Sequence, residues 1–439
     1  MAKYYLSLNH NNQNIDEVSW ADLEYEDYKP KRVDTVLISN QHTADKDLQE
    51  LSTSGIGKVM RNLSFPKFSR QVIAPGGYSF RSFKDPDDDP LSTILNYGSG
   101  QTFAILRENG TIYAWGTSGY GGSGNISGQD YVAVAGSFHA LAALKKDGTI
   151  FSWGNSSNGG KGSISKINGQ SFVAISGNNY AFAALKEDGT IYSWGHTGWG
   201  GMGDVPGKDY IAITGNSLAF AALTKGGKIY AWGSPGRGGI GDVDGENYIA
   251  IGASYGAFAG LKRDGTIYAW GGSDWGGYGG VGEVDGENYI AVTGSSYAFA
   301  ALKKDGTIFS WGDPGHGGVG NVDGENYIAI SGNDYAFAAL KEDGTIFSWG
   351  NSSYGGAGKI DGGNYVTITG AGRCFAALKE DGSIYAWGDP NYGGKGKIDG
   401  QNYVEIIGNS YAFAALRGDN TVYAWGDYDS GGIGEIGLP

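Results

Sequence analysis

Residues 186–195 read KEDGTIYSWG: a polar strand end, an Asp-Gly turn, and an alternating strand that finishes in Trp-Gly. Close copies stand at 145–154, 262–271, 303–312 and 341–350. Asp-Gly is the preferred pair for a two-residue type I′ hairpin turn, because both positions take positive φ. The stretch therefore predicts a tight hairpin, and its copies predict that one structural unit recurs along the chain.

The repeat extends beyond these five copies. Nine Trp-Gly pairs, from Trp115 to Trp425, follow one another at intervals of 38 or 41 residues. Within one unit, such as residues 327–350 (YIAISGNDYAFAALKEDGTIFSWG), apolar and polar residues alternate with period two over three short runs. That period is typical of strands, and it leaves no room for a helix.

Three short strands cannot bury the faces of their own sheet, so we expect the units to stack on each other. Large aromatics such as Phe347 and Trp349 would then pack on the alanine-rich second strand of a neighbouring unit. Radial stacking of this kind is a β-propeller. We predict an all-β fold in which residues 92–439 form a propeller of about nine short, 38-residue, mainly three-stranded blades. An open β-solenoid is the alternative.

The composition changes near residue 91. Only four of the 80 glycines precede residue 92. Residues 1–91 therefore predict a separate small domain, β-rich or mixed, which ends in the acidic linker KDPDDDP at 84–90. They contain no apolar run of signal-peptide length, so we expect a cytoplasmic protein or one exported or released by a non-classical route.

Charge and hydropathy exclude several classes of partner. The formal net charge is −14 and no long basic block occurs, which argues against a nucleic-acid partner. No apolar run is long enough to cross a membrane, so no membrane span is expected. The single cysteine, Cys374, cannot form an intrachain disulfide.

Catalytic and metal-binding motifs are also missing from the sequence. The five histidines show no zinc-site spacing. The GxGxxG string at 277–282 is expected by chance in so Gly-rich a chain, and no helical pattern follows it. The acidic stretch DVDGEN at 242–247 lacks the full ligand set of a calcium loop. The sequence therefore predicts a protein that is not an enzyme and has no catalytic residues, metal or cofactor.

The repeat also carries a family resemblance. The pattern Gly-x-x-[His/Tyr]-x-x-x-Ala-Leu-x-x-Asp-Gly-x-[Ile/Val]-Tyr-x-Trp-Gly resembles the repeat of the regulator-of-chromosome-condensation family and covers residues 92–439. His139 stands where that family often has its histidine. The short unit is more similar to bacterial members, found in surface proteins, toxins and a β-lactamase inhibitory protein, than to the longer eukaryotic blades. The resemblance implies a propeller that binds a protein partner.

Positions that vary between the copies are candidates for binding, because constant positions hold the stack together. Two positions vary most: the fifth residue after each repeat Trp, and the residue that enters the second strand. Because the chain crosses each blade three times, we expect both at the same end of the blades, in an outer and an inner ring opposite the hairpins. The candidate partner-binding residues are Tyr120, Trp199, Arg237, Trp275, His316, Tyr354 and Tyr392 in the outer set, His139, Tyr180, Tyr297, Tyr335, Arg373 and Tyr411 in the inner set, and in addition Tyr428, in the loop after the last repeat Trp.

Two functions fit such a face, because exposed aromatic and Arg side chains mark interaction surfaces. The first is recognition of one protein partner, which the diversity of the outer set favours. The second is glycan binding, as in a lectin, an adhesin or a toxin-associated receptor-binding module, where several blades would act together. A third possibility stays open at this point, in which Tyr180, Tyr297, Tyr335 and Tyr411 only plug the central channel.

Overall fold

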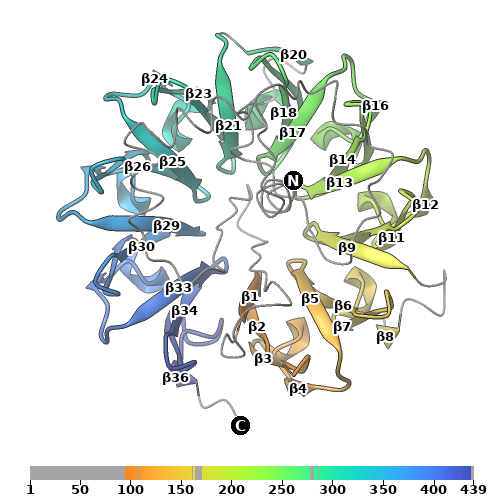
Figure 1. The fold of residues 1–439 in the computed structure, drawn as a ribbon, viewed down its shortest axis with the longest axis horizontal. Helices are drawn as coiled ribbons and strands as arrows, with labels where there is room; N and C mark the ends of the chain where they lie inside the picture. The colour runs from red at the N-terminus through yellow and green to blue at the C-terminus, as the bar shows by residue number, and fades with distance from the viewer. Residues whose placement is uncertain are drawn as a thin grey trace, which may run out of the picture.

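The computed structural model describes residues 94–436, except 108, 161, 164–170, 277–280 and 285. The predicted N-terminal domain, with its acidic linker at 84–90, lies outside the described residues. Over the described range the chain forms nine four-stranded antiparallel sheets, which radiate as blades around a common centre (Figure 1). Strands within each blade follow in chain order, and no α-helix occurs in this part of the protein.

The four strands of each blade differ in position and length. The first strands are β1 (Ile94–Ser99), β5 (Tyr131–Gly136), β9 (Phe172–Gly177), β13 (Tyr210–Gly215), β17 (Tyr248–Ala253), β21 (Tyr289–Gly294), β25 (Tyr327–Gly332), β29 (Tyr365–Ala371) and β33 (Tyr403–Gly408). The second strands are β2 (Thr102–Leu106), β6 (Ala140–Lys145), β10 (Ala181–Lys186), β14 (Ala219–Thr224), β18 (Ala257–Lys262), β22 (Ala298–Lys303), β26 (Ala336–Lys341), β30 (Cys374–Lys379) and β34 (Ala412–Arg417). The third strands, which end in the Trp-Gly pairs, are β3 (Ile112–Gly116), β7 (Ile150–Gly154), β11 (Ile191–Gly195), β15 (Ile229–Gly233), β19 (Ile267–Gly271), β23 (Ile308–Gly312), β27 (Ile346–Gly350), β31 (Ile384–Gly388) and β35 (Val422–Gly426).

A short fourth strand corrects the prediction of three-stranded blades. These strands hold two or three residues each and pair with the third strand. They are β4 (Gly124–Ile126), β8 (Gly162–Ser163), β12 (Gly203–Val205), β16 (Gly241–Asp242), β20 (Val281–Glu283), β24 (Gly320–Asn321), β28 (Gly358–Lys359), β32 (Gly396–Lys397) and β36 (Gly434–Ile436). A 3-10 turn precedes most of them: η3 (Ser118–Tyr120), η4 (Ser156–Asn158), η5 (Thr197–Trp199), η6 (Pro235–Arg237), η7 (Ser273–Trp275), η9 (Pro314–His316), η10 (Ser352–Tyr354) and η11 (Pro390–Tyr392).

The hairpin between second and third strands forms where the sequence predicts it, but the turn type was predicted wrongly. In the third blade Gly189 has φ +78°, whereas Asp188 is not among the residues with positive φ. The Gly189 N–H donates to the Lys186 carbonyl at 3.0 Å, and the Lys186 N–H donates to the Thr190 carbonyl at 2.8 Å. This is a type I turn followed by a glycine bulge, the three-residue hairpin loop. The Asp188 carboxylate accepts from the Thr190 N–H and hydroxyl at 2.9 and 2.7 Å, which accounts for the Asp-Gly-Thr pattern.

Aromatic side chains of one blade pack on alanines of the preceding blade, as the sequence predicts. Phe375 and Trp387 of the eighth blade share a buried cluster with Ala336 and Ala338 of the seventh. The Trp387 indole N–H also donates to the Gly355 carbonyl of the seventh blade at 3.0 Å. Corresponding indole bonds join all the remaining pairs of neighbouring blades in the described ring. The tryptophan of each Trp-Gly pair therefore links its blade to the preceding one. We call this residue the latch tryptophan and its indole hydrogen bond the latch bond.

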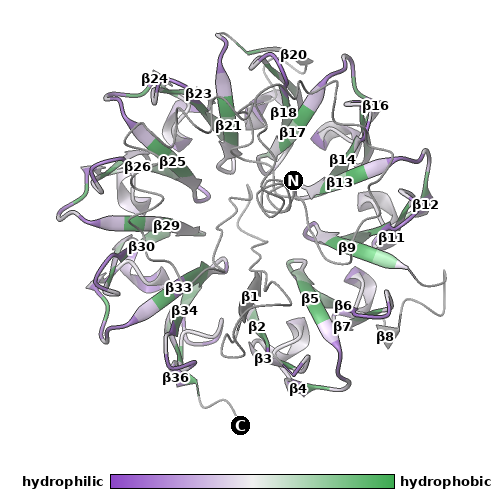
Figure 2. Ribbon diagram, viewed as in Figure 1, coloured by the Kyte–Doolittle hydropathy of each residue, from purple (hydrophilic) through white to green (hydrophobic). Residues whose placement is uncertain are grey.

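The ring closes on itself, so the open-solenoid alternative is wrong. The first strands contact one another in sequence around the centre, and β33 contacts β1. Phe103, Ile105 and Trp115 of the first blade share a buried cluster with Ile407 and Ala412 of the ninth. Hydrophobic residues occupy the strand centres, whereas the loops at the periphery are mostly hydrophilic (Figure 2). None of the helical turns in the described residues is long or apolar enough to span a membrane.

Candidate binding site

The two variable positions of each blade lie at the same end of the strands, here named the turn end. In the third blade the His196 N–H, just after the Trp-Gly pair, donates to the carbonyl of Tyr180 in the turn between β9 and β10 at 3.0 Å. Equivalent bonds occur at other blades, for example from Asp313 to Tyr297 at 2.9 Å. The Asp-Gly hairpins occupy the opposite end, here named the hairpin end.

Side chains of the first-to-second-strand turns hold the 3-10 turns in place. Asn178 Nδ2 donates to the Trp199 carbonyl, and Asn333 Nδ2 to the Tyr354 carbonyl, both at 2.7 Å. In the fifth blade the Ser254 hydroxyl makes the same contact with the Trp275 carbonyl, also at 2.7 Å. The eighth blade has alanine at this turn position, and there the Cys374 thiol donates to the Tyr392 carbonyl at 3.0 Å. The variable side chains therefore project from a rigid frame.

The structure brings the inner and outer sets together in two runs of contacts, which we together name the aromatic belt. Most successive contacts in the belt join an inner to an outer residue; the exceptions are His139–Tyr180 and Arg237–Trp275. The expected two separate rings therefore merge. Ring-centroid distances are 4.7 Å for Tyr120–His139, 5.3 Å for His139–Tyr180 and 4.3 Å for Tyr180–Trp199. A longer run joins Arg237, Trp275, Tyr297, His316, Tyr335, Tyr354, Arg373, Tyr392 and Tyr411.

The belt contains thirteen of the fourteen predicted residues. The remaining one, Tyr428, lies apart from it. Every belt side chain in these contacts is half-buried. Tyr428 is 73% exposed and makes none of the ring contacts found among the described residues. Because each belt residue packs on its neighbours, the belt is a preformed surface rather than a set of free side chains.

The belt is asymmetric around the ring. Asn158, Leu218, Gly256, Ser430 and Gln101 interrupt it at positions that are aromatic or cationic in other blades. One consequence is that two arginines sit in different surroundings. Arg373 lies 5.8, 5.2 and 4.8 Å from the ring centroids of Tyr335, Tyr354 and Tyr392. Arg237 instead lies over Trp275 at 3.7 Å and near Tyr255 at 5.2 Å.

Sequence reasoning missed three residues at the turn end. Tyr255 is 37% exposed and stands one residue before the position compared between blades, so alignment of the copies shows Gly256 instead. His196 stacks on Trp199 with 3.9 Å between ring centroids. Asp334 lies at the middle of the seventh-blade turn. A comparison of all three turn residues, rather than one, would have found Tyr255 and Asp334.

The backbone of these turns forms a chain of hydrogen bonds from blade to blade. The middle residue of each turn donates its N–H to the middle carbonyl of the next blade, at 3.0–3.2 Å from Gly100 through Asp334. Asp334 takes part twice: its carbonyl accepts from Ser296 at 3.0 Å, and its N–H donates to Gly372 at 3.1 Å. Burial raises the pKa of the Asp334 carboxyl to about 6, although a hydrogen bond from Ser296 and the charge of Arg373 oppose the shift.

Several polar nitrogens of the belt region have no hydrogen-bond partner within the described residues. They are His139 Nδ1, His196 Nδ1, Arg237 Nη1 and Trp275 Nε1, all buried. Burial also lowers the pKa of His139. Buried donors without acceptors cost free energy and are uncommon in folded proteins. Their concentration in the first five blades marks this sector of the belt as the one best prepared for an acceptor-bearing ligand.

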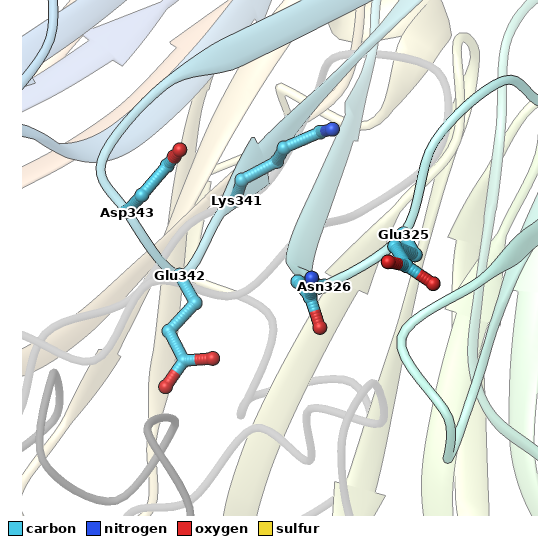
Figure 3. Close-up of a pocket in the computed structure, with 5 residues that line it drawn as sticks. All are labelled: Glu325, Asn326, Lys341, Glu342 and Asp343. Carbon is cyan, nitrogen blue, oxygen red and sulfur yellow. The ribbon is translucent and has the colours of Figure 1, made fainter.

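A pocket at the hairpin end offers no competing site. Glu325, Asn326, Lys341, Glu342 and Asp343 line it (Figure 3). Glu342 and Asp343 point away from each other in Figure 3, so the carboxylates do not converge. Asp343 is engaged by the Thr345 N–H and hydroxyl at 2.9 and 2.6 Å. Across the described residues, no three His, Cys, Asp or Glu side chains lie close enough to hold a metal ion.

A family comparison agrees with this architecture. The regulator of chromosome condensation (RCC1) repeat model matches residues 132–159 and 327–355, each of which covers strands of one blade and its latch tryptophan. The chain is an RCC1-like repeat propeller. No curated protein matches the sequence significantly.

Solved structures resemble this RCC1-like propeller at low identity. Prp20p from Saccharomyces cerevisiae, described with its binding to Gsp1p and histones, is 14% identical, with a TM-score of 0.41 over 60% of this chain and 89% of that chain. The ectodomain of the Physcomitrella patens receptor kinase CR4 is 18% identical, with a TM-score of 0.42 over 59% and 73%. The computationally designed Ika8 protein is 17% identical, with a TM-score of 0.43 over 73% and 99%. These likenesses concern the fold.

Proposed function

We propose that this propeller is a non-catalytic binding protein that recognises a protein partner through the aromatic belt. The observation that carries the proposal is the belt itself, a run of stacked Tyr, Trp, His and Arg side chains whose identity changes from blade to blade. Tyr, Trp and Arg are the residues that contribute most to protein interfaces. Because stacking already restricts these side chains, little conformational entropy is lost when a partner covers them.

The packing of the belt favours a protein over a sugar. Lectin-type recognition needs an aromatic face that is free to stack on a sugar ring. In the belt, His316 contacts Tyr297 at 4.4 Å and Tyr335 at 5.1 Å, so much of its ring surface is occupied. Tyr335 contacts Tyr354 at 4.6 Å in turn. A surface of ring edges and donor groups suits the irregular, hydrogen-bonded contacts of a protein interface.

Photo-crosslinking in the cells that produce the protein tests the proposal. A photoreactive phenylalanine analogue would replace Tyr255 or Tyr428, which are exposed at the turn end, or Asp343, which is exposed at the hairpin end. We expect discrete protein adducts from the two turn-end positions and none from position 343. Adducts from position 343 alone, or strong sugar-inhibitable binding on a glycan array, would overturn the proposal.

A further inference from the structure

The fifth blade departs from the others where its first two strands meet. Its tyrosine, Tyr255, occupies the middle of the turn, and Gly256 stands at the inner belt position. A Cβ atom at residue 256 would lie 2.7 Å from Arg237 Nη1 and 2.7 Å from Trp275 Cδ2. Any side chain there would have to displace both groups. The glycine therefore allows Arg237 and Trp275, from neighbouring blades, to close over the turn.

Arg237 and Trp275 form a close pair that leaves donor groups unused. The guanidinium carbon lies 3.7 Å from the Trp275 ring centroid, a cation–π contact that fixes the guanidinium plane. Stacking in this way leaves the in-plane N–H groups for other bonds. Neither Arg237 Nη1 nor Trp275 Nε1 has an acceptor among the described residues. Both atoms are buried, so a ligand reaches them only when a neighbouring side chain shifts. The ion pairs identified in this part of the chain are His316–Asp313 and Arg417–Glu435, so Arg237 belongs to neither.

Two N–H donors, and a positive charge with no ion-pair partner among the described residues, are complementary to an oxyanion, because a carboxylate or phosphoryl group accepts several hydrogen bonds at once. Tyr255 adds a partly exposed ring beside the pair, 5.2 Å from the guanidinium. We propose that Arg237, Trp275 and Tyr255 form a subsite for an oxyanion carried by an acidic segment of the partner protein. This inference rests on the proposed function and names the chemistry of one contact within it.

The net charge of the protein makes the subsite testable. With a formal charge of −14, the chain as a whole repels acidic peptides. Preferential binding of acidic peptides must therefore come from a local site, and at the turn end of blades four and five Arg237 is the group placed to supply it.

Peptide arrays measure the preference directly. The labelled full chain is applied to peptides with random flanks and a fixed central residue: Glu, Gln, phosphoserine or Ser. We expect at least about tenfold more binding to the Glu set than to the Gln set, or to the phosphoserine set than to the Ser set, because hydrogen bonds to charged groups are strong. The two comparisons distinguish carboxylate from phosphoryl groups as the source of the oxyanion.

Variants locate the preference. Arg237→Gln and Gly256→Tyr, which restores the residue found at positions 180, 297, 335 and 411, should both reduce the ratio to about one. Arg263→Gln, at the hairpin end of the fifth blade, should leave the ratio unchanged. Equal binding of charged and neutral sets, no binding at millimolar peptide, or equal loss in Arg263→Gln would overturn the inference. Equal binding of charged and neutral peptides by the parent protein, with the turn-end crosslinks retained, would reject the subsite and leave the proposed function standing.

Discussion

The indole N–H of Trp115, in the first blade, donates a 3.1 Å hydrogen bond to the carbonyl of Gly431, in the ninth. The same bond joins Trp270 to Gly238, also at 3.1 Å, in the middle of the repeat array. The contact that holds neighbouring blades together is thus used again to join the two ends of the described ring.

We expect Trp115→Phe and Trp270→Phe to destabilise the protein by similar amounts. Each leaves a buried carbonyl without its donor, which costs about 1–3 kcal/mol in the free energy of unfolding. Urea denaturation of both variants measures the costs. In an open stack the terminal latch would contribute little, so a neutral Trp115→Phe beside a destabilised Trp270→Phe would contradict ring closure.

The carbonyl of the glycine that follows each 3-10 turn accepts the latch bond. Packing leaves no room for a side chain at this glycine. Gly317 has φ +97°, and a Cβ there would lie 2.7 Å from Phe337 Cδ2. Gly320 has φ +83°, but a Cβ there would meet nothing within 4 Å. We expect Gly320→Ala to cost about 1–2 kcal/mol from backbone strain alone. Gly317→Ala should cost about 2–5 kcal/mol, because overpacking adds to the strain.

Thermal and urea melts of these two alanine variants separate strain from packing. The difference between them reports the space that Phe337 occupies in the interface between blades. Equal costs for the two substitutions would mean that the interface relaxes freely around an added methyl group, contrary to the close packing described here.

The sequence predicted most of the fold, because the same alternation of apolar and polar residues recurs in every repeat. The hairpin position, the blade number and the Trp-on-Ala packing all follow from period-two alternation and a constant spacing. The fourth strand was missed because two or three Gly-rich residues, such as Gly320–Asn321, are too short to show alternation. The turn type was missed because Asp-Gly suits both the two-residue turn and the glycine bulge.

The candidate site was predicted in part. Variation between copies identified the belt residues and their common end of the blades. It did not show that inner and outer positions touch, because that depends on the radius at which the turns meet. It also missed Tyr255, which a shift of one residue hides behind Gly256.

The contacts of Trp275 in the belt change the stability cost that we expect when it is replaced by alanine. As a variable residue outside the repeated core, it would be expected to affect stability by no more than about 0.5 kcal/mol when replaced by alanine. The structure packs its ring against a buried cluster, under Arg237 and 6.0 Å from Tyr297. We now expect Trp275→Ala to cost about 1–3 kcal/mol.

Trp270→Ala, which truncates a fully buried side chain, should cost about 3–5 kcal/mol and calibrates the comparison. Urea melts of the two variants measure both values. A Trp275→Ala protein as stable as the parent would show that the belt side chains do not support one another, and would weaken the argument that the surface is preformed.

Asp334, near the centre of the ring, should give the free energy of unfolding an unusual pH dependence. Burial raises the pKa of its carboxyl to about 6, above the value of about 3.9 expected in the unfolded chain. Between these values the folded protein holds a proton that the unfolded chain has lost, so this group's contribution to stability decreases as the pH rises from about 4 to about 6. Above the upper value the folded protein carries a desolvated charge.

Asp334→Asn should remove that cost, since asparagine is neutral and already stands at the equivalent position 179. We expect the variant to match the parent near pH 4 and to exceed its free energy of unfolding by up to about 3 kcal/mol at pH 8. Asp343→Asn is the control: hydrogen bonds from Thr345 lower the pKa of Asp343, so its contribution to stability is lost as the pH falls. Difference curves from urea melts should therefore slope in opposite directions, and a flat curve for Asp334→Asn would show that its carboxyl is solvated in the folded protein.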